Sequence, residues 1–221
     1  MKTFWSINSL CLLALFFLPL LSAADLSTYR GFQFGMNLNT ALKHSGMDVS
    51  EVTMIHERPA RIQELNWHPS RFSSSATDPV EQVLLSFYKG QLFRMVIDYD
   101  NEKTEGLTAE DMIKAVSGLY GTAVRPIAGT VLPSAAFSEG VTVIARWDSV
   151  EYSFNLARSP YGSGFVLIAF SKPLDVLAQA AMASGVLLDE QEAPQRLRDK
   201  EESAQNELDK ARLINKAHFR P

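Results

Sequence analysis

The chain has 221 residues but only one cysteine, Cys11. That cysteine lies inside an apolar run near the N-terminus. If the run is removed as part of a leader, the remaining chain has no disulfide, no thiolate metal ligand and no cysteine nucleophile. Its fold must then be stabilised by an apolar core alone, which a chain of this length can build.

The sequence also lacks a strong charge of either sign. Its formal net charge is −4, and no basic cluster stands out along the chain. Proteins that bind nucleic acids neutralise phosphates with Lys and Arg, and anionic membrane surfaces attract the same residues. The composition therefore argues against a nucleic-acid partner and against docking on an anionic membrane surface.

Long apolar runs are missing apart from LCLLALFFLPLL, residues 10–21. A basic residue precedes this run, and small residues stand one and three positions before Asp25. These are the parts of a secretory signal peptide, whereas a membrane-spanning helix needs about 20 apolar residues. We predict a signal peptide over residues 1–24, export to the bacterial periplasm or beyond, and no stable membrane span after cleavage.

The strongest local pattern is a β-hairpin. VEQVLLSFY (80–88) and QLFRMVIDY (91–99) are apolar runs separated by Lys89-Gly90, a typical two-residue turn. Alternation puts Leu92 on the face opposite the main apolar set. That main set is predicted to comprise Val83, Leu85, Phe87, Phe93, Met95, Ile97 and Tyr99.

Helix signals separate the strands. Thr108 and Asp111 form a capping-box pattern before a helix that ends at Gly121. Its predicted buried stripe consists of Met112, Ala115, Val116 and Leu119. Three strands follow at 140–147, 149–157 and 164–171, and in the middle one the apolar residues alternate with Glu151, Ser153 and Asn155. Such alternation is typical of a sheet with one solvent-exposed face.

Antiparallel meanders with helices between them favour the α+β class. We predict one antiparallel sheet of five to seven strands, with two or three helices packed on one face. The order of a helix followed by strands occurs twice in outline, at 38–99 and at 108–171.

A last compact helix is predicted from Ser171 to Ser184, with Gly185 as its stop. These features predict a single domain over residues 25–185. Acids and bases in nearly equal number dominate the rest, so residues 186–221 are predicted to be a charged helical or disordered tail.

Two segments carry a family resemblance. FGMNLNTALKHSG (34–46) and LSFYKGQLFRMVIDYD (85–100), with a helix that ends in LYG, resemble small exported bacterial modules. These include β-lactamase-inhibitor-like domains and the small lipoproteins of outer-membrane assembly. The resemblance covers residues 31–121, and the chain differs from the lipoproteins because it lacks their lipid-bearing cysteine. It implies a binding or scaffolding role in the cell envelope.

IHERPARIQELNWHP, residues 55–69, is the segment richest in reactive side chains. His56 and His68 lie twelve residues apart, a spacing that does not by itself assemble a zinc site. His56 and Glu57 are adjacent, so on a strand they point to opposite faces. A metal-assisted or acid–base hydrolase that uses His56 and His68 stays open as the alternative function.

Other reactive motifs are missing from the sequence. Gly162-Ser163-Gly164 is not a nucleophile elbow, and the chain has no phosphate-binding loop, dinucleotide fingerprint or calcium loop. No cofactor or catalytic residue is implied. We therefore expect a non-enzymatic binding or scaffolding protein whose partner is another envelope protein or a small ligand. The candidate contact residues are Tyr161, Trp67, His68 and Arg58.

Overall fold

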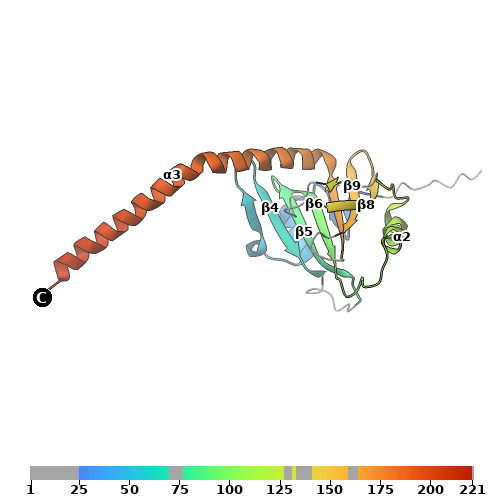
Figure 1. Ribbon diagram of the computed structural model, residues 1–221, viewed down its shortest axis with the longest axis horizontal. Coiled ribbons are helices and arrows are strands. Elements are labelled where there is room, and N and C mark those ends of the chain that lie inside the picture. The colour runs from blue at the N-terminus through green and yellow to red at the C-terminus, as the bar shows by residue number, and fades with distance from the viewer. Residues whose placement is uncertain (1–24, 70–76, 127–130, 133–140, 159–163, 221) are drawn as a thin grey trace, which may run out of the picture.

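The computed structural model describes residues 25–69, 77–126, 131–132, 141–158 and 164–220, and it confirms the α+β class (Figure 1). Its main antiparallel sheet has seven strands and a two-residue edge strand, in the order β3-β4-β5-β6-β10-β9-β8-β7. These strands are β3 (Thr53–His56), β4 (Ile62–Trp67), β5 (Val80–Tyr88), β6 (Gln91–Tyr99), β7 (Val131–Leu132), β8 (Val141–Asp148), β9 (Tyr152–Arg158) and β10 (Phe165–Ser171). A small hairpin precedes them, β1 (Thr28–Tyr29) and β2 (Phe32–Gln33). The helices are α1 (Leu38–Ser45), α2 (Ala109–Tyr120) and α3 (Lys172–His218), with a single 3₁₀ turn at Val49–Glu51.

The sheet consists of two halves with the same element order. In each half a helix precedes a meander, α1 before β3–β6 and α2 before β7–β10. The last strands of the two meanders, β6 and β10, pair antiparallel at the centre of the sheet, where Val96 lies opposite Ile168. The helix-then-strands order seen in the sequence is therefore present twice.

Local signals fix the ends of several elements. Lys89 and Gly90 have φ of 49° and 78°, as a type I′ turn between paired strands requires. Thr108 and Asp111 form the predicted capping box of α2, and α1 ends at Gly46 in the left-handed conformation. The predicted hairpin and the predicted helix α2 are confirmed.

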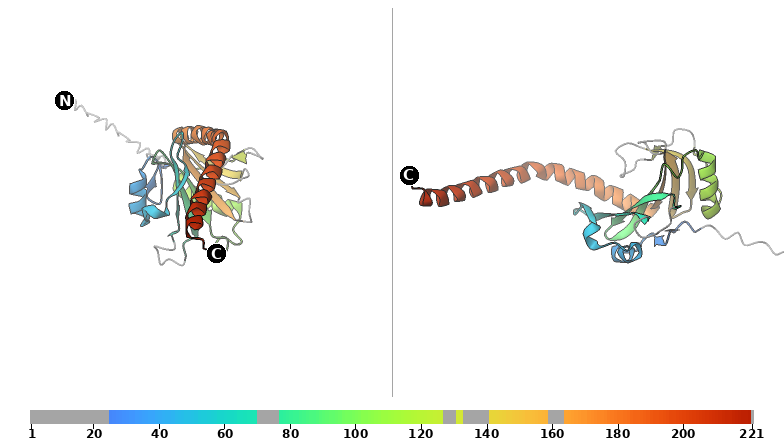
Figure 2. Two further views of the ribbon diagram at one scale, coloured as in Figure 1. Left: turned by 90° about the vertical axis from the view of Figure 1, so that its left-hand side faces the viewer. Right: turned by 90° about the horizontal axis from the view of Figure 1, so that it is seen from below.

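One face of the sheet carries the main core. Helices α1 and α2 and the β1–β2 hairpin cover this face (Figure 2), and its largest fully buried side chain is Trp147 of β8. Trp147 Nε1 donates to the carbonyl oxygen of Gly121 at 3.0 Å, so the end of α2 is fixed to the sheet. Tyr120, the last residue of α2, packs its ring 4.3 Å from the ring of Phe154.

The opposite face packs against α3, and a bulge decides which residues reach it. The β5–β6 register shifts between Ser86 and Phe87, so the strict alternation predicted for β6 is wrong. Leu92 joins the main core, whereas Phe93 turns to the other face and packs with Ile62 and Ala178 of α3.

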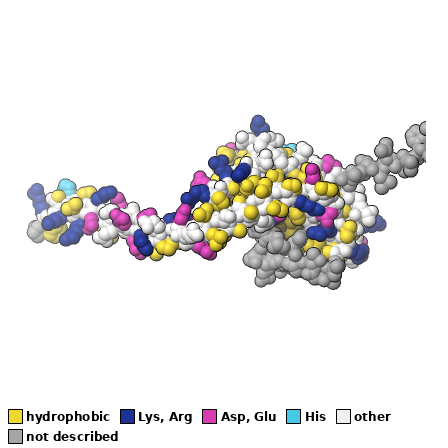
Figure 3. Space-filling model, turned by 90° about the horizontal axis from the view of Figure 1, so that it is seen from above, with side chains coloured by type: hydrophobic (Ala, Val, Ile, Leu, Met, Phe, Trp, Pro, Cys, Tyr) yellow, Lys and Arg dark blue, Asp and Glu magenta, His cyan; other side chains and the backbone are white. Residues whose placement is uncertain are grey.

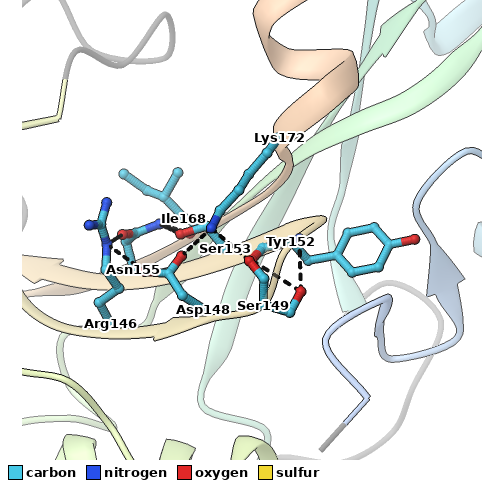
Figure 4. A network of polar contacts seen from close by, with 8 residues as sticks. All are labelled: Arg146, Asp148, Ser149, Tyr152, Ser153, Asn155, Ile168 and Lys172. Carbon is cyan, nitrogen blue, oxygen red and sulfur yellow. Dashed lines mark hydrogen bonds and ion pairs between the residues drawn. The ribbon is translucent and has the colours of Figure 1, made fainter.

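The prediction that β9 has a solvent-exposed face is also wrong. Ser153 and Asn155 are fully buried, as are Phe154 and Leu156 with which they alternate, so both faces of the sheet are covered at β9. Their polar groups are satisfied locally, since Asn155 Nδ2 donates to Ser153 Oγ and Asn155 Oδ1 accepts from Arg146 Nε, both at 3.0 Å (Figure 4).

The same network holds the start of α3. Lys172 Nζ lies 3.0 Å from Asp148 Oδ1 and donates to the carbonyl oxygen of Ser149 at 2.7 Å (Figure 4). Arg94 of β6 forms an ion pair with Asp175 one turn further along α3. The helix therefore begins at a defined point on the sheet.

Helix α3 does not stop at Gly185, so the predicted helix end is wrong. It continues through Pro194 to His218, and the segment predicted as a helical or disordered tail is helical. A Cβ on Gly185 would lie 3.1 Å from the carbonyl oxygen of Arg58, so this glycine permits close contact with the β3–β4 turn. Beyond Pro194 the helix projects away from the sheet (Figure 1).

Candidate functional site

Helix α2 buries only part of its apolar stripe. Met112 and Val116 are buried, as predicted, but Ala115 is exposed and 70% of the Leu119 surface is accessible. The prediction that all four residues are buried is therefore wrong. Leu119 is therefore accessible to solvent, although Val116 one turn earlier is buried.

The gap beside α2 is a cavity of about 610 Å³. Pockets of about 300–1,000 Å³ hold most small ligands. Its walls are α2, the β1–β2 hairpin and the end of β6, with Leu107 and Thr104 from the loop before α2. The side chains from α2 are Met112, Ala115, Val116, Leu119 and Tyr120.

Three tyrosines line the cavity. Tyr29 from the hairpin and Tyr99 from β6 lie on the elements that face α2, and Tyr120 stands at the end of α2 itself. The Tyr120 hydroxyl donates to the carbonyl oxygen of Thr28 at 3.2 Å, and the Tyr29 side chain hydrogen-bonds Tyr99. Most of the hydrogen-bonding capacity of these tyrosine hydroxyls is thus used within the protein. The tyrosines therefore contribute mainly their rings to the cavity surface.

Two lining side chains are ionised at physiological pH, Arg30 and Asp25; the Asp25 carboxylate accepts hydrogen bonds from Ser27, which lower its pKa. Burial raises the pKa of Tyr99 to about 12, and it also raises the pKa values of Tyr29 and Tyr120. The tyrosines therefore stay protonated. The protonated tyrosines and the apolar α2 stripe give most of the lining no charge, which suits an uncharged ligand.

Arg30 is the cation at the cavity wall, and its charge is balanced. Arg30 follows Tyr29 in the hairpin turn, and its two terminal nitrogens lie 2.6 and 2.8 Å from the carboxylate oxygens of Asp78. The hydrogen bond with Arg30 lowers the pKa of Asp78, and the carboxylate raises the pKa of Arg30 in return. A bidentate pair leaves little charge to attract an anionic ligand.

The histidines are not brought together. His56 in β3 lies opposite Ile62, and His68 follows β4 six residues further along, which places the two histidines about 20 Å apart. His44 is on α1, where its Nε2 lies 2.9 Å from the carbonyl oxygen of Arg30. Among the residues that the structure describes, no three metal-ligating side chains of the His, Cys, Asp or Glu type converge.

The predicted contact residues are dispersed as well. Arg58 is exposed, but its guanidinium is paired with Glu192 of α3 at 2.6 Å, so it attaches the helix to the β3–β4 turn. Trp67 is half-buried, with its ring 5.1 Å from that of Phe32, and its indole Nε1 has no hydrogen-bond partner among the described residues. His68 is half-buried just after β4. Tyr161 and the predicted signal peptide, residues 1–24, lie outside the described residues.

Arg58, Trp67 and His68 are not among the described residues that line the α2 cavity. The sequence pattern predicted that Tyr99 and Leu119 are buried in the core, and it assigned no role to Tyr29 or Tyr120. The one available sequence signal was the apolar stripe of α2, but periodicity cannot show whether the surface opposite such a stripe fills the gap.

Comparisons with protein-family models, with curated proteins and with solved structures find no match for this chain. Among its described helices, none is both long enough and apolar enough to cross a membrane. The function must therefore be argued from the geometry itself.

Proposed function

We propose that the protein is an exported, non-enzymatic binding protein of the bacterial cell envelope, and that its α2 cavity holds a small, uncharged ligand with an alkyl or aryl group. The exposure of Leu119 beside a cavity lined mainly by apolar side chains and protonated tyrosines carries this proposal. Export is inferred from the N-terminal leader pattern in the sequence.

The energetics favour an apolar ligand. Burying a leucine-sized side chain against another apolar surface contributes about 1.5–3 kcal/mol, and the cavity exposes several such groups from α2. Arg30 is already paired, so an anionic ligand would have to compete with Asp78 for it. A ligand that fills the space between Leu119 and the tyrosines on the facing elements gains this burial without such a cost.

The hydrolase alternative has no comparable support. His56 and His68 stand at opposite ends of β4, and the carboxylate paired with His56 belongs to Asp189 of α3, 3.8 Å from Nδ1. General acid–base chemistry needs partners within hydrogen-bond reach of one reacting group. The arrangement instead suits a contact between α3 and the β3–β4 turn.

A neutral fluorescent probe, N-phenylnaphthylamine, tests the proposal. We expect the chain that begins at Asp25 to enhance its fluorescence saturably, and Leu119→Asp to weaken binding by about tenfold or more, because a carboxylate in an apolar cavity must be desolvated. Leu119 is exposed, so the substitution should not disturb folding.

Leu208→Asp is the matched control, because Leu208 is a similarly exposed helical leucine far along α3. It should bind the probe like the unmodified protein. If the unmodified protein does not bind the probe, or if both variants lose binding equally, the cavity is not the binding site.

A further inference from the structure

The first half of α3 is apolar on both sides. Its inner side packs on the sheet through residues such as Leu174 and Ala178. Its outer side also presents apolar residues at spacings of three and four, and these define the outer α3 face. The outer α3 face consists of Pro173, Val176, Leu177, Ala180, Ala183 and Leu187.

These outer residues are exposed. Val176 is 69% accessible and Leu187 is 58% accessible. Figure 3 shows hydrophobic side chains in a nearly continuous band over this part of the helix. The one charged side chain between Pro173 and Leu188, Asp175, is paired with Arg94 of the sheet. A helix that is apolar all round is normally buried on all sides, so this face calls for a partner.

Along the outer α3 face, the order of large and small side chains is nearly the same from either end. Bulky Val176 and Leu177 stand at one end, Leu187 stands at the other, and Ala180 and Ala183 lie between them. The Ser184 hydroxyl, also near the middle, donates to the carbonyl oxygen of Ala180 at 2.9 Å, so it needs no external partner. A two-fold interface requires such self-complementarity, and small central residues let two helices approach closely.

The helix dipoles favour an antiparallel arrangement of the two helices. Antiparallel pairing opposes the two dipoles, whereas parallel pairing would align them side by side. The charges at the two ends of the outer α3 face contribute less, because Lys172 is already paired with Asp148 and Asp189 with Arg196.

A lipid surface fits this segment less well. Residues 172–192 contain four acids (Asp175, Asp189, Glu190 and Glu192) and one base, Lys172. Helices that lie on anionic membranes carry Lys and Arg on their polar flanks, and this segment has the opposite balance.

We propose that the protein forms an antiparallel homodimer through the outer α3 face. With the two-fold axis beside Met182, Val176 and Leu177 of one copy pack near Leu187 of the other, and Ala180 lies opposite Ala183. The contact strip is about 21 Å long at 1.5 Å per residue. This strip alone is smaller than a standard interface of about 800 Å² per partner, so the dimer is weak and depends on concentration.

Sedimentation velocity from low to high micromolar concentration tests the proposal on the chain that begins at Asp25. We expect a shift from monomer to dimer as concentration rises. Ala180→Arg should weaken association by at least about tenfold, because it places a charged side chain against the partner's apolar strip. Ala204→Arg, an exposed position of the same helix beyond Pro194, should leave association unchanged.

Orientation has its own test. The chain that begins at Asp25 has no cysteine, so Val176→Cys and Leu187→Cys variants can be mixed and oxidised. An antiparallel dimer gives mainly the mixed disulfide, and a parallel dimer gives disulfides between identical variants. The proposal is overturned by a monomer at every concentration, by a dimer insensitive to Ala180→Arg, by parallel cross-links, or by a monomer that instead sediments with phosphatidylglycerol vesicles.

Discussion

Asp78 connects two segments that are distant in the sequence. It accepts both hydrogen bonds from Arg30 in the β1–β2 turn, and its Oδ1 accepts from the Val80 amide at 3.0 Å at the start of β5. Arg30 itself has a left-handed backbone, with φ of 49°, next to Gly31. One carboxylate therefore positions the hairpin that forms a wall of the α2 cavity.

Replacing Asp78 with Asn should reduce stability in a pH-dependent way. Arg30 holds the pKa of Asp78 below its usual range, so the ion pair stabilises the fold above about pH 4 and is lost as pH falls through the lowered pKa. Asp78→Asn should lower the free energy of unfolding by about 1 kcal/mol at pH 7, and the difference should shrink toward pH 3.

Urea denaturation at the two pH values measures this effect. Glu110→Gln is the control, since it removes the carboxylate of the fully exposed Arg125–Glu110 pair and should change stability little at either pH. A loss for Asp78→Asn that is equal at both pH values would show that the charge is not the cause.

At the scale of elements, glycines act in two different ways in the helices. Gly118 of α2 has open space where a Cβ would be, whereas a Cβ on Gly185 of α3 would meet the carbonyl oxygen of Arg58 and the ring of His56. The first glycine costs helix stability without an evident structural gain. The second permits α3 to lie against the β3–β4 turn.

The two substitutions to alanine should therefore have different effects. Gly118→Ala should raise the free energy of unfolding by about 0.5–1 kcal/mol, the usual gain within a helix. Gly185→Ala should bring no gain or a loss, because the backbone of the β3–β4 turn must move by a few tenths of an ångström. Thermal and urea unfolding of the two variants side by side provide the measurement. Equal gains at both positions would contradict the role assigned to Gly185.

Elements whose signals are local could be predicted, because caps and turns depend on neighbouring residues. Thr108 with Asp111 and Lys89 with Gly90 are such cases. Other features depend on distant partners. The bulge that turns Phe93 toward α3 and the burial of Asn155 inside the sheet are set by packing across the chain. The cavity also depends on distant partners. An apolar stripe on α2 is compatible with a facing surface that packs against it and equally with one that leaves a cavity.

Gly185 and Pro194 illustrate the same difference within α3. Both residues are common where helices end, and the sequence supported a stop at the first. The helix continues because its inner side is held to the sheet and the β3–β4 turn, through Ala178 and then through the Arg58–Glu192 pair. Tertiary contacts outweigh a local stop signal here.

At the scale of the whole molecule, the described chain has two parts that differ in how much of their surface is buried by packing. The sheet and the helices packed on it form the body, whereas α3 beyond Pro194 projects from that body with every residue from Gln195 to Arg220 exposed (Figure 2). Among the described residues, its side chains form hydrogen bonds and ion pairs only within the helix, such as the 2.7 Å hydrogen bond between Gln195 and Asp199. The projecting segment thus adds length but little burial.

Ending the chain at Pro194 should therefore leave the body intact. We expect the midpoint of thermal unfolding to change by less than about 2 °C, because exposed residues away from packing sites contribute little to stability. Far-UV circular dichroism should lose the signal of roughly half of α3. Probe binding in the α2 cavity and association through the outer α3 face should both persist, because neither uses residues after Pro194. A large fall in the unfolding midpoint would instead mean that the projecting helix folds back on the body in solution, and the outer α3 face would then be the surface to which it returns.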